Sequence, residues 1–194
     1  MHSQNNVYIE KIATIPTIGN FSRFHLNNYA TKWISSIPKS YLAYPIVIMC
    51  IGSDKHVVDS YGPLVGTLLQ QVDDNWIIFG TLDNPVTSFN IENSIKVAKR
   101  FYPDSLIICL DAAVSRTPKI GNIEIFRGPL KPGDALGKKF TPIGDYHIKG
   151  YVNYSEVSHD THFMNDTRLA VVYRMAQVTV YLLTLLKEKI PQID

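Results

Sequence analysis

The chain has 194 residues, a formal net charge of +2, and 45% hydrophobic residues. This balance excludes a disordered chain, which would combine few apolar residues with a high net charge, and the length favours one domain. The small net charge, with no basic stripe interleaved with aromatic residues, argues against a partner that is a nucleic acid.

The predicted elements alternate between helices and short apolar strands. Residues 1–20 show little periodicity and are expected to run over the surface as an N-terminal extension. Helices are predicted over residues 22–37, 62–72, 91–101 and 166–187, the third capped by the side chain of Asn90. Strands are predicted over residues 46–51, 76–79, 105–110 and 147–153, and Gly121–Asn122 indicates a hairpin-like turn.

Continuously apolar strands alternating with helices are typical of a mostly parallel sheet that is covered on both faces. We therefore expect one three-layer α/β domain over residues 21–194. Residues 175–186 form an uncharged stretch with apolar residues on more than one helical face. One face should pack on the sheet, and the rest should meet another helix or a second copy of the chain in a homo-oligomer.

The same patterns predict the compartment. The first ten residues lack the apolar segment of a signal peptide. The uncharged stretch at residues 175–186 is shorter than the roughly 20 residues of a membrane span. We expect a cytoplasmic protein with no membrane partner. Cys50 and Cys109 lie in apolar runs, so both should be reduced and buried.

Two aspartates follow predicted strands, where ligands bind in open α/β sheets. Asp111 stands at the tip of the strand 105–110, and Asp59 lies just before the helix that Gly62 and Pro63 open. If the strands are neighbours, the carboxylates face one crevice, and one keeps a proton while the other activates water. Arg116 could hold a substrate carbonyl. The alternatives are an ordinary helix cap for Asp59 and turn chemistry for Asp111.

Metal and phosphate sites are less well supported by the pattern. His147 could complete a metal site with the two aspartates, but a lone histidine at a strand start is more often structural. His159 and His162 are a weak metal pair. Residues 131–138 lack the spacing of a phosphate-binding loop and instead predict a loop beside the cleft.

Several short motifs, taken in chain order, resemble the sporulation protein YyaC family. They are residues 50–54 (CIGSD), 59–66 (DSYGPLVG), 80–86 (GTLDNPV), 111–112 (DA), 128–133 (GPLKPG), 144–148 (GDYHI) and 165–169 (NDTRL). That family is similar to the germination protease of endospore-forming bacteria, which degrades small acid-soluble spore proteins, and to hydrogenase maturation proteases.

The resemblance implies a sporulation-associated peptidase with Asp59 and Asp111 as catalytic residues and no cofactor. Substrate-positioning residues would be Asp54, Lys55, Arg116 and His147. Its partner would be a protein or peptide, such as a small acid-soluble spore protein, in the cytoplasm of the sporulating cell or the spore interior.

Two other functions stay open from the sequence. Residues 55–58 depart from the family's loop, and the chain is shorter than a germination protease, which favours a non-catalytic binding or regulatory protein of sporulation. The resemblance to maturation proteases, whose acidic residues and a histidine grip nickel, would instead imply a metal-dependent enzyme using Asp59, Asp111 and His147.

Overall fold

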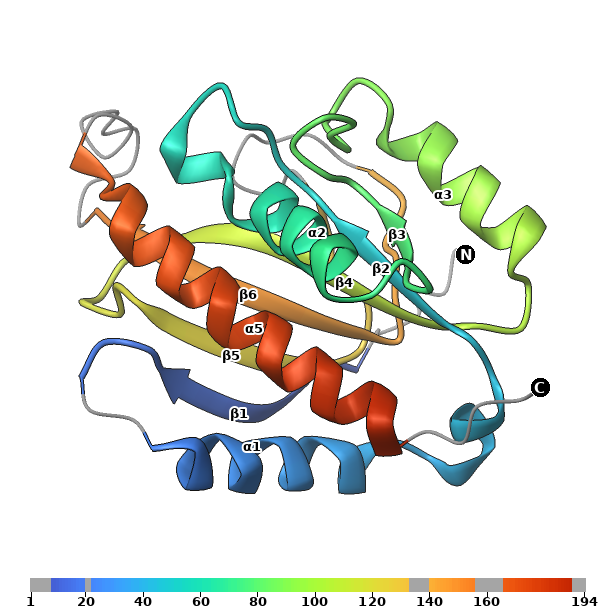
Figure 1. The fold of residues 1–194 in the computed structure, drawn as a ribbon. Coiled ribbons are helices and arrows are strands. Elements are labelled where there is room, and N and C mark those ends of the chain that lie inside the picture. Colours follow the sequence, from blue (N-terminus) through green and yellow to red (C-terminus); the bar gives the residue numbers. More distant parts are fainter. Residues whose placement is uncertain (1–7, 20–21, 133–139, 156–165, 190–194) are drawn as a thin grey trace, which may run out of the picture.

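The computed structural model describes residues 8–19, 22–132, 140–155 and 166–189, and its strands form one six-stranded sheet (Figure 1). The strands are β1 (Glu10–Pro16), β2 (Ile46–Cys50), β3 (Ile77–Phe79), β4 (Leu106–Ser115), β5 (Asn122–Arg127) and β6 (Tyr146–Tyr154). Their order is β1-β5-β6-β4-β2-β3. Strands β3, β2, β4 and β6 pair in parallel, whereas β5 is antiparallel to both β6 and β1. The predicted α/β class with a mostly parallel sheet is confirmed.

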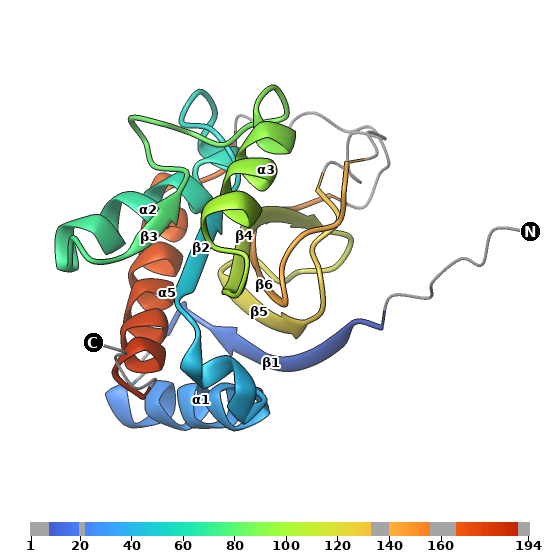
Figure 2. The same ribbon diagram turned by 90° about the vertical axis from the view of Figure 1, so that its right-hand side faces the viewer.

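Helices lie on both faces of this sheet, as expected for three layers (Figure 2). Helices α1 (Arg23–Ser36), α2 (Tyr61–Val72) and α5 (Leu169–Lys189) pack on one face, and α3 (Ile91–Phe101) packs on the other. Two short 3-10 turns, η1 (Lys39–Ala43) and η2 (Val57–Asp59), precede β2 and α2.

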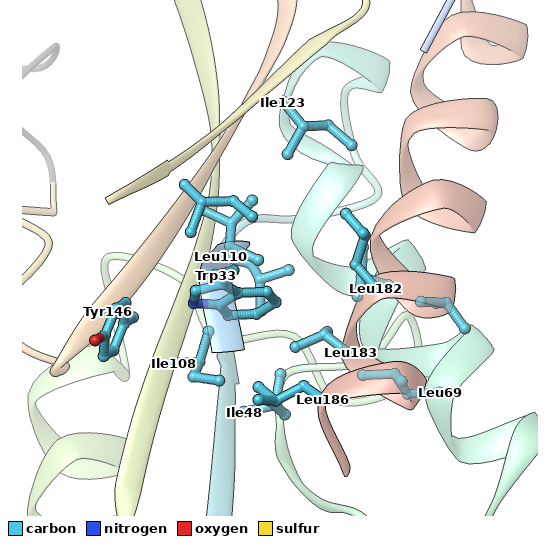
Figure 3. Close-up of a cluster of buried hydrophobic side chains, with 14 of the residues drawn as sticks. Trp33, Ile48, Leu69, Ile108, Leu110, Ile123, Tyr146, Leu182, Leu183 and Leu186 are labelled. Atoms are coloured by element: carbon cyan, nitrogen blue, oxygen red, sulfur yellow. The ribbon is translucent and has the colours of Figure 1, made fainter. Parts of the chain in front are cut away.

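The larger core cluster lies between the sheet and the three helices (Figure 3). Ile48, Ile108 and Leu110 of the sheet share it with Leu182, Leu183 and Leu186 of α5, all fully buried. Successive residues of a strand point to opposite faces, so the alternate residues of β2 and β4 pack against α3 in a second cluster. Burial on both faces explains why these strands are continuously apolar.

Helix α5 is covered on its sides as well as on its sheet face. It contacts both α1 and α2, and the hydroxyl of Tyr181 donates to Oδ1 of Asn27 on α1 at 2.8 Å. The expectation that another helix meets the second apolar face is confirmed. Helix α5 is long and apolar enough to cross a membrane, but its buried residues identify it as the core helix of a folded domain.

The cysteine prediction is confirmed, and three local predictions need correction. Cys50 and Cys109 are free and buried. Gly121 and Asn122 do not open a hairpin, because β6 lies between β4 and β5. Asn90 precedes α3 but caps no helical N–H: its Oδ1 accepts the backbone N–H of Thr87 at 2.8 Å instead.

The third correction concerns the N-terminal residues, which do not simply run over the surface. Residues 10–16 form the edge strand β1, and Ile15 is fully buried in register with Ile123 of β5. A bulge between Lys11 and Ala13 shifts the register. Because a bulge breaks the period-2 alternation that marks a strand, this strand was not visible in the sequence. The domain boundary at residue 20 stays a prediction.

The burial of the α5 leucines predicts the effect of truncating one of them. Replacing Leu183 with alanine removes a fully buried side chain and should lower the free energy of unfolding by about 3 kcal/mol. Leu169→Ala, on the same helix but 54% exposed, should change it by less than about 1 kcal/mol. Urea titrations of both variants measure this, and equal losses would contradict the assignment of the core.

Candidate active site

The two aspartates meet where strand β2 ends and strand β4 continues. Strand β2 pairs with β4 as far as Cys50 and Leu110, and the N–H of Ile51 donates to the carbonyl of Leu110 at 2.8 Å. Asp111 is therefore the first β4 residue beyond β2. The chain after Ile51 turns back, and η2, which ends with Asp59, contacts β4.

The loop that carries Asp59 closes on Gly52. Gly52 has a φ of +135°, and a Cβ there would lie 2.1 Å from the Asp59 carbonyl oxygen, so the position requires glycine. The N–H of Ser53 donates to the same carbonyl at 3.0 Å. At Gly62 a Cβ would lie 2.2 Å from the carbonyl oxygen of Ile51. These close approaches fix the backbone on both sides of Asp59.

Both carboxyls have raised pKa values, and the pair interacts. Burial, followed by the charge of Asp59, raises the pKa of Asp111 to about 7, against the lowering effects of Lys149 and the Ala112 backbone. Burial raises the pKa of Asp59 to about 6, partly offset by the Ser53 backbone and by His56. The expected rise by burial and mutual repulsion is found at Asp111, and burial raises the pKa of Asp59 as well. Midway between the two values, near pH 6.5, the pair holds about one proton in total.

The ordinary structural roles considered for these aspartates do not account for them. The N-cap of α2 is Ser60, whose hydroxyl donates to the carbonyl of Val57, so Asp59 is not the cap. Asp111 lies within β4, in register with Lys149 of β6, rather than at a strand tip. The catalytic role of the pair remains a prediction.

The structure brings only some of the expected positioning residues near the pair. Asp54 and Lys55 are exposed on the loop that leads to Asp59. Arg116 is exposed just beyond the end of β4. It stands five positions beyond Asp111, about 16 Å along an extended chain at roughly 3.3 Å per residue, so the two do not form one cluster.

His147 is a buried structural residue on the same side of the sheet as Asp111. Its Nδ1–H donates to the carbonyl of Gly128 at 2.8 Å, and its ring stacks on Phe126 at a centroid distance of 4.7 Å. Burial lowers the pKa of His147 to about 4, so the ring is neutral at pH 7.

These residues do not fit a nickel site. Within the described ranges, no three His, Cys, Asp or Glu side chains come together as metal ligands. His147 is in register with Cys109, two positions before Asp111 along the sheet. We therefore derive no step through a metal. His159, His162 and residues 133–139 lie outside the described residues.

Sequence reasoning missed Lys149, which the strand register places beside Asp111. It is half-buried, and its Nζ lies 5.9 Å from the ring centroid of Phe126. The available signal was its spacing of two from His147, which puts both on one face of a strand. Without the pairing of β4 with β6, that spacing points to no partner.

Two cavities, of about 110 and 250 Å³, lie on the described surface away from the aspartates. The first is lined by Asn153, Asp166 and Arg168 among others, and the second by Leu68, Gln71 and Gln177 between α2 and α5. The crevice expected at the aspartate pair therefore stays a prediction.

The raised pKa of Asp111 predicts a pH-dependent stability difference. Its folded pKa lies above the ordinary value of 3.8, so the folded protein binds the proton more tightly and loses this contribution as pH rises towards 7. Asp111→Asn should therefore be close to wild type in stability near pH 4 and more stable at pH 8, by up to about 4 kcal/mol for this shift. Urea titrations across this range measure the difference. A gap that is constant with pH would contradict a buried, proton-sharing Asp111.

Comparison with known proteins identifies the family to which this sequence belongs. The chain is 36% identical over 159 residues to the uncharacterized protein YyaC of Bacillus subtilis strain 168, a match that spans 79% of this chain and 77% of that protein. A solved structure that it resembles is the [NiFe] hydrogenase maturation protease HycI from Thermococcus kodakarensis KOD1, at 17% identity and a TM-score of 0.44, covering 73% of this chain and 93% of that one. Residues 21–181 match a family model described as a protein of unknown function, DUF1256. The resemblance to YyaC is confirmed, and the chain belongs to the DUF1256 family.

Proposed function

We propose that this protein hydrolyses peptide bonds, with Asp59 and Asp111 as its acid–base pair. One observation carries the proposal: η2, which ends with Asp59, packs against β4, which carries Asp111, and burial raises the pKa of both carboxyls towards neutrality. A pair that shares one proton near neutral pH has a base and an acid available at the same time. Surface aspartates titrate near pH 4 and offer only the base.

The proposal gives each residue one role. Asp59 is the base that takes a proton from water as the water oxygen bonds to the scissile carbonyl carbon. Asp111 donates its proton to the amide nitrogen as the carbon–nitrogen bond breaks. Asp59 is then protonated and Asp111 ionised, and one proton transfer between them restores the starting state.

The substrate follows from the resemblance to the germination protease. Its two acidic segments match Asp59–Pro63 and Asp111–Ala112 of this chain. We propose small acid-soluble spore proteins as the substrates and the cytoplasm of the sporulating cell or spore as the place of action. Lys55 and Asp54, exposed on the Asp59 loop, would contact the bound peptide.

Activity assays on two asparagine variants test the proposal. Purified protein is incubated with small acid-soluble spore proteins, and the fragments are followed by mass spectrometry. Asp59→Asn and Asp111→Asn should each lower the rate at least about 100-fold, the usual contribution of a general acid or base. The matched control is Asp74→Asn, an exposed aspartate in the turn between α2 and β3, which should cleave like wild type.

The pH profile gives a second, independent outcome. Below about pH 6 the base is protonated, and above about pH 7 the acid is ionised, so the rate should peak between these values. Cleavage that persists in both asparagine variants would contradict the catalytic assignment. A wild-type protein that binds spore proteins without cutting them would instead support a non-catalytic binding protein of sporulation.

A further inference from the structure

The ammonium groups of three lysines lie over the part of the sheet that α3 leaves uncovered, and only two of them form an ion pair with a described residue. Helix α3 packs on β2 and β4, so the same face of β1, β5 and β6 carries no helix of the described chain (Figure 2). Lys11 and Lys119 form ion pairs with Glu124 at 3.3 and 3.2 Å. Lys149 forms no ion pair with any described residue.

Lys149 has carboxyls on both sides, but neither neutralises it. It stands in register with Glu124 on β5 and with Asp111 on β4. Glu124, with a side chain only 3% exposed, already accepts hydrogen bonds from Lys11, Thr14, Lys119 and Tyr151. Asp111 is held partly protonated by burial and by Asp59, which makes it a weak counter-ion.

The ammonium of Lys149 therefore has no carboxylate partner within the described ranges. Its described contact is with the face of Phe126, which is itself stacked on His147. The aromatic face orients a cation but neutralises it only weakly. A half-buried cation gains most from a carboxylate, since charge-assisted hydrogen bonds are the strong ones.

We propose that Lys149 is a specificity-determining residue that binds the side-chain carboxylate of an acidic residue in the peptide substrate. The inference rests on the proposed function and deepens it, because it names acidic peptides as the substrate class. The carboxylate would sit over β6 beside Asp111, with the peptide crossing the open face of β5 and β6. A peptide's terminal carboxylate has the same chemistry, and the experiment separates the two.

Binding of short peptides tests this without relying on cleavage. Acetylated and amidated octapeptides with a central Glu, Gln or Lys are titrated into the Asp111→Asn protein at low salt and followed by NMR shifts. This variant removes the proposed acid and leaves Lys149 no carboxylate beside it on β4. The Glu peptide should bind about tenfold more tightly than the Gln peptide, as expected for one charge-assisted hydrogen bond. A Gln peptide with a free terminal carboxylate should gain less than the Glu peptide.

Variants of Lys149 give the decisive comparison. Adding Lys149→Met should reduce the Glu preference to less than about twofold, Lys149→Arg should keep it, and Lys149→Glu should favour the Lys peptide. The matched control is Lys11→Met, on the same face but already paired with Glu124, which should keep the preference. A structural role for Lys149 would lower affinity for all three peptides equally.

The outcomes separate this inference from the proposed function. The inference is overturned if the protein with Lys149 intact shows no preference for the Glu peptide, or if that preference survives Lys149→Met. This holds even if peptides are cut. Undetectable binding of the Glu peptide at millimolar concentration also overturns it. Conversely, a preference that depends on Lys149 without any cleavage by the protein with Asp111 intact supports the inference and contradicts the peptidase.

Discussion

Strand β4 has ten residues and its neighbour β2 has five, and the candidate site depends on this difference in length. Beyond Leu110, β4 keeps β6 on one side but has lost β2 on the other. The loop after β2 lies on the side of β4 that β2 no longer covers, and it brings η2 into contact with β4. A carboxyl on each element is thus removed from water at the same place, and this removal raises both pKa values.

Such a site opposes the stability of the fold around it. Each buried carboxyl resists ionisation, so the folded state is weakened as soon as the surrounding pH favours the charged form. The backbone nevertheless packs closely around the site, because at Gly52 and Gly62 a side chain would clash with a carbonyl oxygen. Locally destabilising features are typical of functional sites, and the rest of the core offsets their energetic cost.

The sheet-forming strands could be predicted because burial on two faces leaves a continuous apolar run. The same logic placed Asp59 and Asp111 together, since it depends only on which strands end beside each other. The same reasoning wrongly placed Arg116 near the aspartates. Residues 111–115 look like a loop by composition, yet they continue β4 through pairing with β6. Register is a tertiary property, and for the same reason Lys149 was not identified.

His147 shows a different limit of the sequence. Its residue type and position after Gly144 and Asp145 suit a ligand as well as a structural residue. The carbonyl of Gly128, 19 positions away, and the ring of Phe126 decide the matter. Only the antiparallel return of β5 against β6 brings these groups to the histidine.

The pairing of β1 with β5 affects the order in which the chain can assemble. Strand β1 precedes β5 in the chain, and the lysine and glutamate that join the two strands are 113 positions apart in sequence. Closing so long a loop is entropically costly and slow. The apolar residues of β1 therefore stay unpaired until β5 has formed, and this edge of the sheet is completed late in folding.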